Sequence, residues 1–289
     1  MSNFDLFKTS FIKSVKMKLN SLIVALCCVL FNNVCFGQQW INLPQNDDAR
    51  LYMANFREQN VTEKWLRCTG VFIRDNHVLT AASCVHNRPR ESLRLFSGVT
   101  GTILTQSGTQ HLALEVHIHP DFNAQFPLRN NLAVVRVDNA ITRPEPLRPR
   151  PLGRMSANRF CTMLGWQGYQ LGMVNEWNPL RMFSVPIVNS TQCGSNHQGA
   201  YCTSNVGLTS GFSTCGGLMG APVFCGNDQV SGIVVRDNFC DRPGTNVGGS
   251  FVSVEDFRGW IDEVSSGINN KFSVTLLMTA LFVLFKISS

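Results

Sequence analysis

Between residues 50 and 260 the chain is built of short runs of β-branched and apolar residues, separated by Gly, Asn and Pro. GVFIRDNHVLTAA, LALEVHIHP and NLAVVRVDNAI are examples. No long stretch in this region has the three- to four-residue apolar spacing of an amphipathic helix. Many short strands joined by turn residues are typical of a barrel or sandwich, so we predict an all-β fold.

A connector and a terminal helix interrupt this pattern. The Pro- and Arg-rich stretch near residues 141–155 splits the strands into two halves, and we interpret it as a stiff, solvated linker rather than a polyanion site. At residues 254–264, VEDFRGWIDEV has apolar residues at three- and four-residue steps, which predicts a helix that closes the domain. The arginines in and beside the linker are Arg143, Arg148, Arg150, Arg154 and Arg159.

Residues 1–37 have the order of a secretory signal peptide: lysines, then an apolar run, then small residues. The run from 22 to 31 is about half as long as a membrane-spanning helix, so a retained anchor is the weaker interpretation. Met17 is an alternative start, because the sequence from there is a complete signal by itself. We expect cleavage near Gly37 and an extracellular protein.

Residues 265–289 form a second apolar end, with fourteen uncharged residues between Lys271 and Lys286. A helix of that length rises about 21 Å, less than the ~30 Å of a bilayer core. Small residues before the apolar part are typical of a glycosylphosphatidylinositol (GPI) signal, although the spacer is short. We predict such an anchor, with a retained tail or a freely secreted chain as alternatives. The candidate attachment residues are Ser265, Ser266 and Gly267.

The formal net charge of +6 at pH 7 comes mostly from these two ends. They hold six lysines and one acidic residue, so the region between them is nearly neutral. That balance gives no reason to expect a nucleic-acid partner.

The cysteines predict an oxidising compartment. Three of the eleven lie in the signal segment, which leaves eight. An even number in a secreted chain indicates four disulfides, although eight cysteines permit 105 pairings and their spacing does not choose among them. The sequence contains no CxxC or HExxH, and His117 and His119 stand alone before a proline, so we expect no metal and no cofactor.

Four segments, taken in order, resemble the chymotrypsin-like serine peptidases. CTGVFIRDNHVLTAASCV is similar to the segment around the family's catalytic histidine, and CTMLGWQG to its Cys and GlyTrp turn. CGGLMGAPVFC is similar to CxGDSGGPLxC, and FVSVEDFRGWIDEV to the closing helix. The resemblance implies a domain at residues 38–264 with two six-stranded antiparallel β-barrels and a C-terminal helix. It also implies the pairs Cys68 with Cys84, Cys161 with Cys225, Cys193 with Cys202, and Cys215 with Cys240.

The same resemblance places three replaced residues at the catalytic triad. Ser83 stands where the family has histidine, Asn131 where it has aspartate, and Met219 where it has the nucleophilic serine. A hydroxyl is no base near neutral pH, a neutral amide does not stabilise an imidazolium, and a thioether forms no acyl intermediate. We therefore expect no catalytic residues and no peptidase activity.

Positions around the triad are altered too. Leu218 replaces the aspartate that pairs with the new amino terminus after activation cleavage, and no RIVGG-like sequence precedes Cys68. Ser213 falls at the floor of the specificity pocket. Val235, Arg236 and Asp237 replace the family's SerTrpGly ledge, so the cleft is either unconstrained or reused for binding.

We expect the protein to act by binding another protein. Similar inactive homologues, common in insects, act as cofactors, decoys or regulators of extracellular proteolytic cascades in immunity or reproduction; this implies a protease, inhibitor or receptor as partner and an insect source. One alternative is a residual or rewired hydrolase, but His77 and His86 do not occupy the place of the lost base. An adhesive cell-surface protein is another. Asn60 and Asn189 lie in NVT and NST sequons and are predicted N-glycosylation sites.

Overall fold

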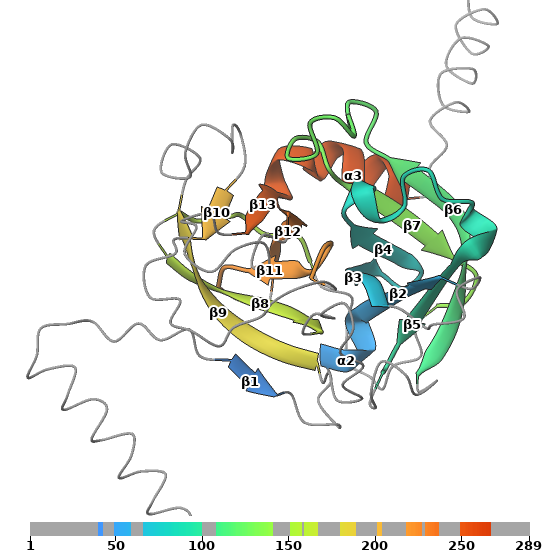
Figure 1. Ribbon diagram of the computed structural model, residues 1–289, viewed down its shortest axis with the longest axis horizontal. Coiled ribbons are helices and arrows are strands. Elements are labelled where there is room, and N and C mark those ends of the chain that lie inside the picture. Colours follow the sequence, from blue (N-terminus) through green and yellow to red (C-terminus); the bar gives the residue numbers. More distant parts are fainter. Residues whose placement is uncertain are drawn as a thin grey trace, which may run out of the picture. The chain divides into compact units, whose positions relative to one another are not determined.

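Two closed antiparallel β-barrels contain most of the strands in the computed structural model (Figure 1). The structure describes residues 40–42, 49–58, 66–99, 108–140, 151–157, 159–166, 180–188, 201–203, 218–226, 229–236 and 249–266. All structural statements below concern these residues.

The first barrel closes in the order β2-β3-β4-β7-β6-β5. Closure comes from β2, which pairs with β3 along one edge and with β5 along the other. The strands are β2 (Met53–Glu58), β3 (Leu66–Arg74), β4 (His77–Thr80), β5 (Leu93–Ser97), β6 (Thr109–Ile118) and β7 (Ala133–Val137).

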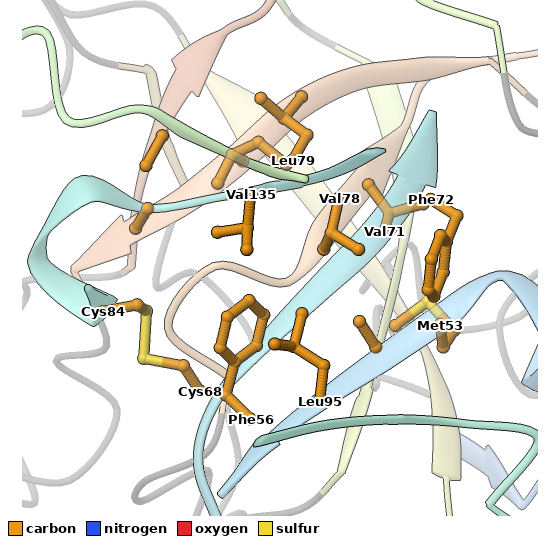
Figure 2. Close-up of a cluster of buried hydrophobic side chains, with 14 of the residues drawn as sticks. Met53, Phe56, Cys68, Val71, Phe72, Val78, Leu79, Cys84, Leu95 and Val135 are labelled. Atoms are coloured by element: carbon orange, nitrogen blue, oxygen red, sulfur yellow. A yellow bond between two sulfur atoms is a disulfide. The ribbon is translucent and has the colours of Figure 1, made fainter. Parts of the chain in front are cut away.

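The interior of this barrel is filled by apolar side chains (Figure 2). Phe56 points inward beside Leu95 and Val78, and all three are at most 2% exposed. Gly70 lets the strands approach here, because a Cβ at this position would lie 2.7 Å from Val78 Cγ1. The pattern of short apolar strands therefore produces a packed core.

The second barrel is formed by β8 (Arg159–Trp166), β9 (Leu180–Val188), β10 (Tyr201–Thr203), β11 (Pro222–Phe224), β12 (Val230–Arg236) and β13 (Ser250–Ser253). The sheet order is β1-β9-β10-β13-β12-β11-β8, and β8 also pairs with β9, which closes the ring of six. β1 (Trp40–Asn42) pairs with β9 in addition to this ring. The prediction of two six-stranded antiparallel barrels is confirmed.

The closing helix is also confirmed, with one difference in its start. A 3-10 turn, η4 (Glu255–Phe257), precedes the α-helix α3 (Arg258–Ser265). Arg74 holds the end of α3, because its Nε donates to Ser265 Oγ at 2.8 Å and its Nη2 to Asp262 Oδ1 at 3.3 Å. The shorter helical elements are α2 (Ala49–Tyr52), η1 (Ala82–Cys84) and η2 (Arg90–Ser92). Within the described part of the chain, no helix has the length and apolar character that a membrane span requires.

Two of the four implied disulfides are present in the structure. Cys68 is bonded to Cys84 with their Cα atoms 5.9 Å apart, and Cys161 to Cys225 with 4.5 Å between Cα atoms. Cys202 is also disulfide-bonded. The implied partner of Cys202, Cys193, and both members of the fourth pair, Cys215 and Cys240, lie outside the described residues.

Several other predictions lie outside the described residues as well. These are the signal segment 1–37, residues 141–150 of the linker, Asn60, Asn189, Ser213, Asp237, and the tail from Gly267. Of the remaining anchor candidates, Ser265 is buried in α3 and Ser266 is exposed.

Candidate functional site

Ser83 and Asn131 are brought together by the pairing of β4 with β7. Ser83 lies in η1 just after β4, and Asn131 lies two residues before β7. Because Thr80 and Ala133 are register partners, the ends of the two strands place these residues side by side. The Ser83 amide donates to Asn131 Oδ1 at 2.9 Å, and Asn131 Nδ2 donates to Ser83 Oγ at 3.2 Å.

Asn131 is fully buried, and its amide is used by more than Ser83. Its Nδ2 donates to the Pro127 carbonyl at 2.6 Å and lies 3.5 Å from the Val235 carbonyl of β12. The amide is thus surrounded by acceptors. A carboxylate at this position would have no proton to donate to any of them.

Met219 reaches the same region from the second barrel. Its carbonyl accepts a hydrogen bond from the amide of Thr69, next to the Cys68–Cys84 disulfide, at 2.8 Å. The following residue, Gly220, has a φ of 80°, and a Cβ there would lie 2.2 Å from the Thr69 carbonyl. Only glycine fits this close approach. The three positions that the resemblance identified therefore meet at one place, next to the end of β4.

Leu218 is fully buried in an apolar cluster of the second barrel. Its Cδ2 lies so close to the Gly165 backbone that a Cβ on Gly165 would be 2.3 Å away. The cluster around it also contains Met155, Met163, Val234 and Phe251. The site where the family has a buried ion pair is therefore packed with hydrocarbon and thioether groups.

The ledge positions are described only in part. Val235 is 2% exposed, and its carbonyl points to the Asn131 amide. Arg236 is the last residue of β12 and pairs in register with Ser250.

Two histidines, His77 and His86, are close to Ser83 in the sequence. His77 is buried on β4, where burial and then the charges of Arg136 and Arg74 lower its pKa. The His86 ring packs edge-on against Phe122, 5.3 Å between ring centres. In the described parts of the chain, neither imidazole hydrogen-bonds Ser83.

His117 and His119 have structural contacts too. His117 Nε2 lies 3.2 Å from Glu115 Oε2, and the His119 ring packs edge-on against Phe257 and Trp260 at 5.0 Å. Over the described ranges there is no group of three or more His, Cys, Asp or Glu side chains that could hold a metal ion.

Comparison with known families identifies the fold. A family model described as Trypsin matches residues 43–261. The chain belongs to the trypsin family. Ser83, Asn131 and Met219, which meet next to the end of β4, stand at the positions that the motifs assign to the triad of this family.

Individual members of the trypsin family are distant relatives of this chain. Trypsin-2 of Salmo salar is 25% identical over 67% of this chain and 83% of its own length. A snake venom serine protease homolog of Bothrops jararaca is 26% identical over 70% and 79%. Granzyme M of Homo sapiens is 27% identical over 85% and 96%. A trypsin of the beetle Phaedon cochleariae is similar to the same degree, 27% identical over 68% of this chain and 78% of its own length. The relatives therefore span fish, snakes, insects and mammals, and the insect source stays a prediction.

Proposed function

We propose that this member of the trypsin family is a non-catalytic serine protease homologue that acts by binding protein. The observation that carries the proposal is the reciprocal hydrogen bonding of Ser83 and Asn131. The pair occupies the positions of the base and of its orienting carboxylate. It satisfies its own hydrogen bonds and includes no group that takes up a proton near neutral pH.

Met219 and Leu218 support the same proposal. The Met219 thioether has no proton to lose and cannot form an acyl intermediate. Leu218 is buried among apolar groups, so a charged amino terminus inserted beside it would be desolvated without a partner. Cleavage would therefore create no ion pair between a new amino terminus and position 218 that could order the site.

An extracellular location agrees with the disulfides that the structure contains. Disulfide-bonded domains of this kind are typical of secreted proteins. We infer a protein partner, a protease, inhibitor or receptor of an extracellular proteolytic cascade. The relative from Bothrops jararaca, which is named as a serine protease homolog, is in keeping with this role. A GPI anchor at the C-terminus remains part of the proposal.

Labelling with a fluorophosphonate probe tests inactivity. We expect the purified chain and its Met219→Ser variant to remain unlabelled, because Ser83 supplies no base. An active trypsin serves as the positive control, and Met219→Leu as the matched control for changes in packing. Stoichiometric labelling of the unchanged chain would overturn the proposal in favour of a rewired hydrolase.

Cross-linking in the native extracellular fluid tests the binding role. Partners should be recovered by mass spectrometry with the folded chain and lost with a chain whose disulfides have been reduced and alkylated. Recovery of membrane lipids or matrix polysaccharides alone would favour the adhesive alternative.

A further inference from the structure

The loop that joins β6 to β7, residues 119–132, presents one aromatic side chain to solvent. Phe126 is 66% exposed, more than any other large hydrophobic residue in the described part of the chain. The other two large apolar side chains of this part of the loop, Phe122 and Leu128, pack against the main hydrophobic core. The fold therefore covers its neighbours and leaves Phe126 outside.

Hydrogen bonds fix the backbone on both sides of Phe126. Its amide donates to the Asn123 carbonyl at 2.9 Å, and its carbonyl accepts from the Arg129 amide at 3.3 Å. The Asn123 side chain accepts from the Gln125 amide at 2.8 Å. Two consecutive turns therefore hold the Cα atom of Phe126 in a defined position, which lowers the entropy that ordering this loop in a complex would cost.

Asn131 connects these turns to the altered triad. Its Nδ2 donates to the carbonyl of Pro127, the residue after Phe126, at 2.6 Å. An ionised aspartate at this position would have no proton for that carbonyl. The replacement that removes the orienting carboxylate therefore supplies a donor that holds the exposed turn.

The tip of the loop carries no charge. Residues 123–127 are all exposed, and their side chains are two amides, a phenyl ring, an alanine and a proline. The centres of protein–protein interfaces have a similar composition, because charged residues are depleted there and aromatic residues are enriched. A bilayer fits this tip less well, since binding to a membrane surface depends on a larger apolar area and on basic residues.

We propose that residues 123–127 form a protein-contact turn and that Phe126 is its principal contact, entering an uncharged apolar pocket of a folded partner protein. A ring that protrudes from a convex turn requires a concave site, and such sites are lined by apolar side chains. A large aromatic side chain buried in this way contributes more to binding than the residues around it. This inference rests on the proposed binding function and names the part of the surface that performs it.

Site-specific cross-linking tests the turn. The full chain with benzoylphenylalanine in place of Gln125, next to Phe126, is added to the native extracellular fluid and irradiated. Mass spectrometry identifies the cross-linked protein and the peptide that was reached, which should line an apolar pocket. The affinity of the unmodified chain for that protein is then measured after its purification.

Phe126→Ser should weaken this affinity about 30-fold or more. Leu112→Ser is the matched control, because Leu112 is 39% exposed on β6; its affinity should stay within about twofold of that of the unchanged chain. Both variants should keep the Tm within about 2 °C, since each removes an exposed side chain.

Asn131→Asp provides an independent variant. It keeps the acceptor for the Ser83 amide and loses the donor to Pro127. At pH 7, with folding verified by circular dichroism, it should lower the yield of the cross-link from position 125. An unchanged yield would show that the position of the turn does not depend on Asn131.

The outcomes separate this inference from the function on which it rests. If general chemical cross-linking recovers a protein that position 125 does not reach, or that Phe126→Ser binds as tightly as the unchanged chain does, only this inference fails. If neither kind of cross-linking recovers a protein, the proposed function fails as well. Cross-links between copies of this chain would replace the partner by a second copy. Flotation with vesicles of phosphatidylcholine and phosphatidylserine that requires Phe126 would replace it by a bilayer; either result overturns the proposal.

Discussion

At the scale of single residues, Asn131 shows how the altered site is stabilised. Its amide donates to Pro127, and the Ser83 amide donates to it, so each end of the side chain has a definite role. We expect Asn131→Asp, which restores the family's residue, to lower the free energy of unfolding by about 1 to 3 kcal/mol. The buried carboxyl has a raised pKa, so the loss should grow as the pH rises above about 4.

Urea unfolding at several pH values measures this effect. Asn123→Asp is the control, because Asn123 is exposed and only accepts, from the Gln125 amide at 2.8 Å, a bond that a carboxylate keeps. An Asn131→Asp variant as stable as its parent at neutral pH would contradict the role given to the amide.

Leu218 gives a second prediction at this scale. Leu218→Asp buries a carboxylate among apolar groups with no partner, and it should cost about 3 to 5 kcal/mol or prevent folding. Leu218→Met conserves volume and should cost under about 1.5 kcal/mol. Secreted yield and Tm compare the two; equal behaviour would mean that a counter-charge reaches this position.

At the scale of elements, the two disulfides should contribute differently to the free energy of unfolding. Cys161–Cys225 joins positions 64 apart in sequence, and Cys68–Cys84 joins positions 16 apart. By loop-closure entropy, replacing the first pair by serines should cost about 1 kcal/mol more than replacing the second. Urea midpoints of the two double variants test this, and the reverse order would show that strain or residual structure outweighs loop length.

The elements also show what the sequence could predict. Alternating apolar runs predicted the long strands, but β1 and β10 have only three residues each, too few for a periodicity. The motifs located Ser83, Asn131 and Met219, since each lies close to the end of a recognisable strand, after β4, before β7 and before β11. They could not reveal the approach of Asn131 to the Val235 carbonyl, which joins residues 104 apart.

At the scale of the whole molecule, stability should fall in mild acid. Burial lowers the pKa of His77 and His111, so both are neutral in the folded state and take up protons more readily when unfolded. Their contribution is complete above about pH 6.5 and is lost as the pH falls through that range towards their lower folded values.

Tm measured between pH 7.5 and 5 tests this expectation. The double variant His77→Gln, His111→Gln should show a flatter pH dependence, even if its Tm is lower throughout. Arg136 and then His117 lower the pKa of Glu115 to about 2. Glu115 therefore titrates below this pH range and does not affect the measured slope. An unchanged slope in the double variant would mean that other groups titrate.

The hydrogen bond from Arg74 to Ser265 fixes the end of the last helix to the first barrel. Since Arg74 of the first barrel holds Ser265 in place, an anchor attached at Ser266 would begin directly at the folded body. A lipid anchor attached at Ser266 would have no peptide spacer between it and α3, so the end of α3 would lie close to the bilayer. The search for a partner would then be two-dimensional, and partners on the same cell would be favoured over those in the surrounding fluid.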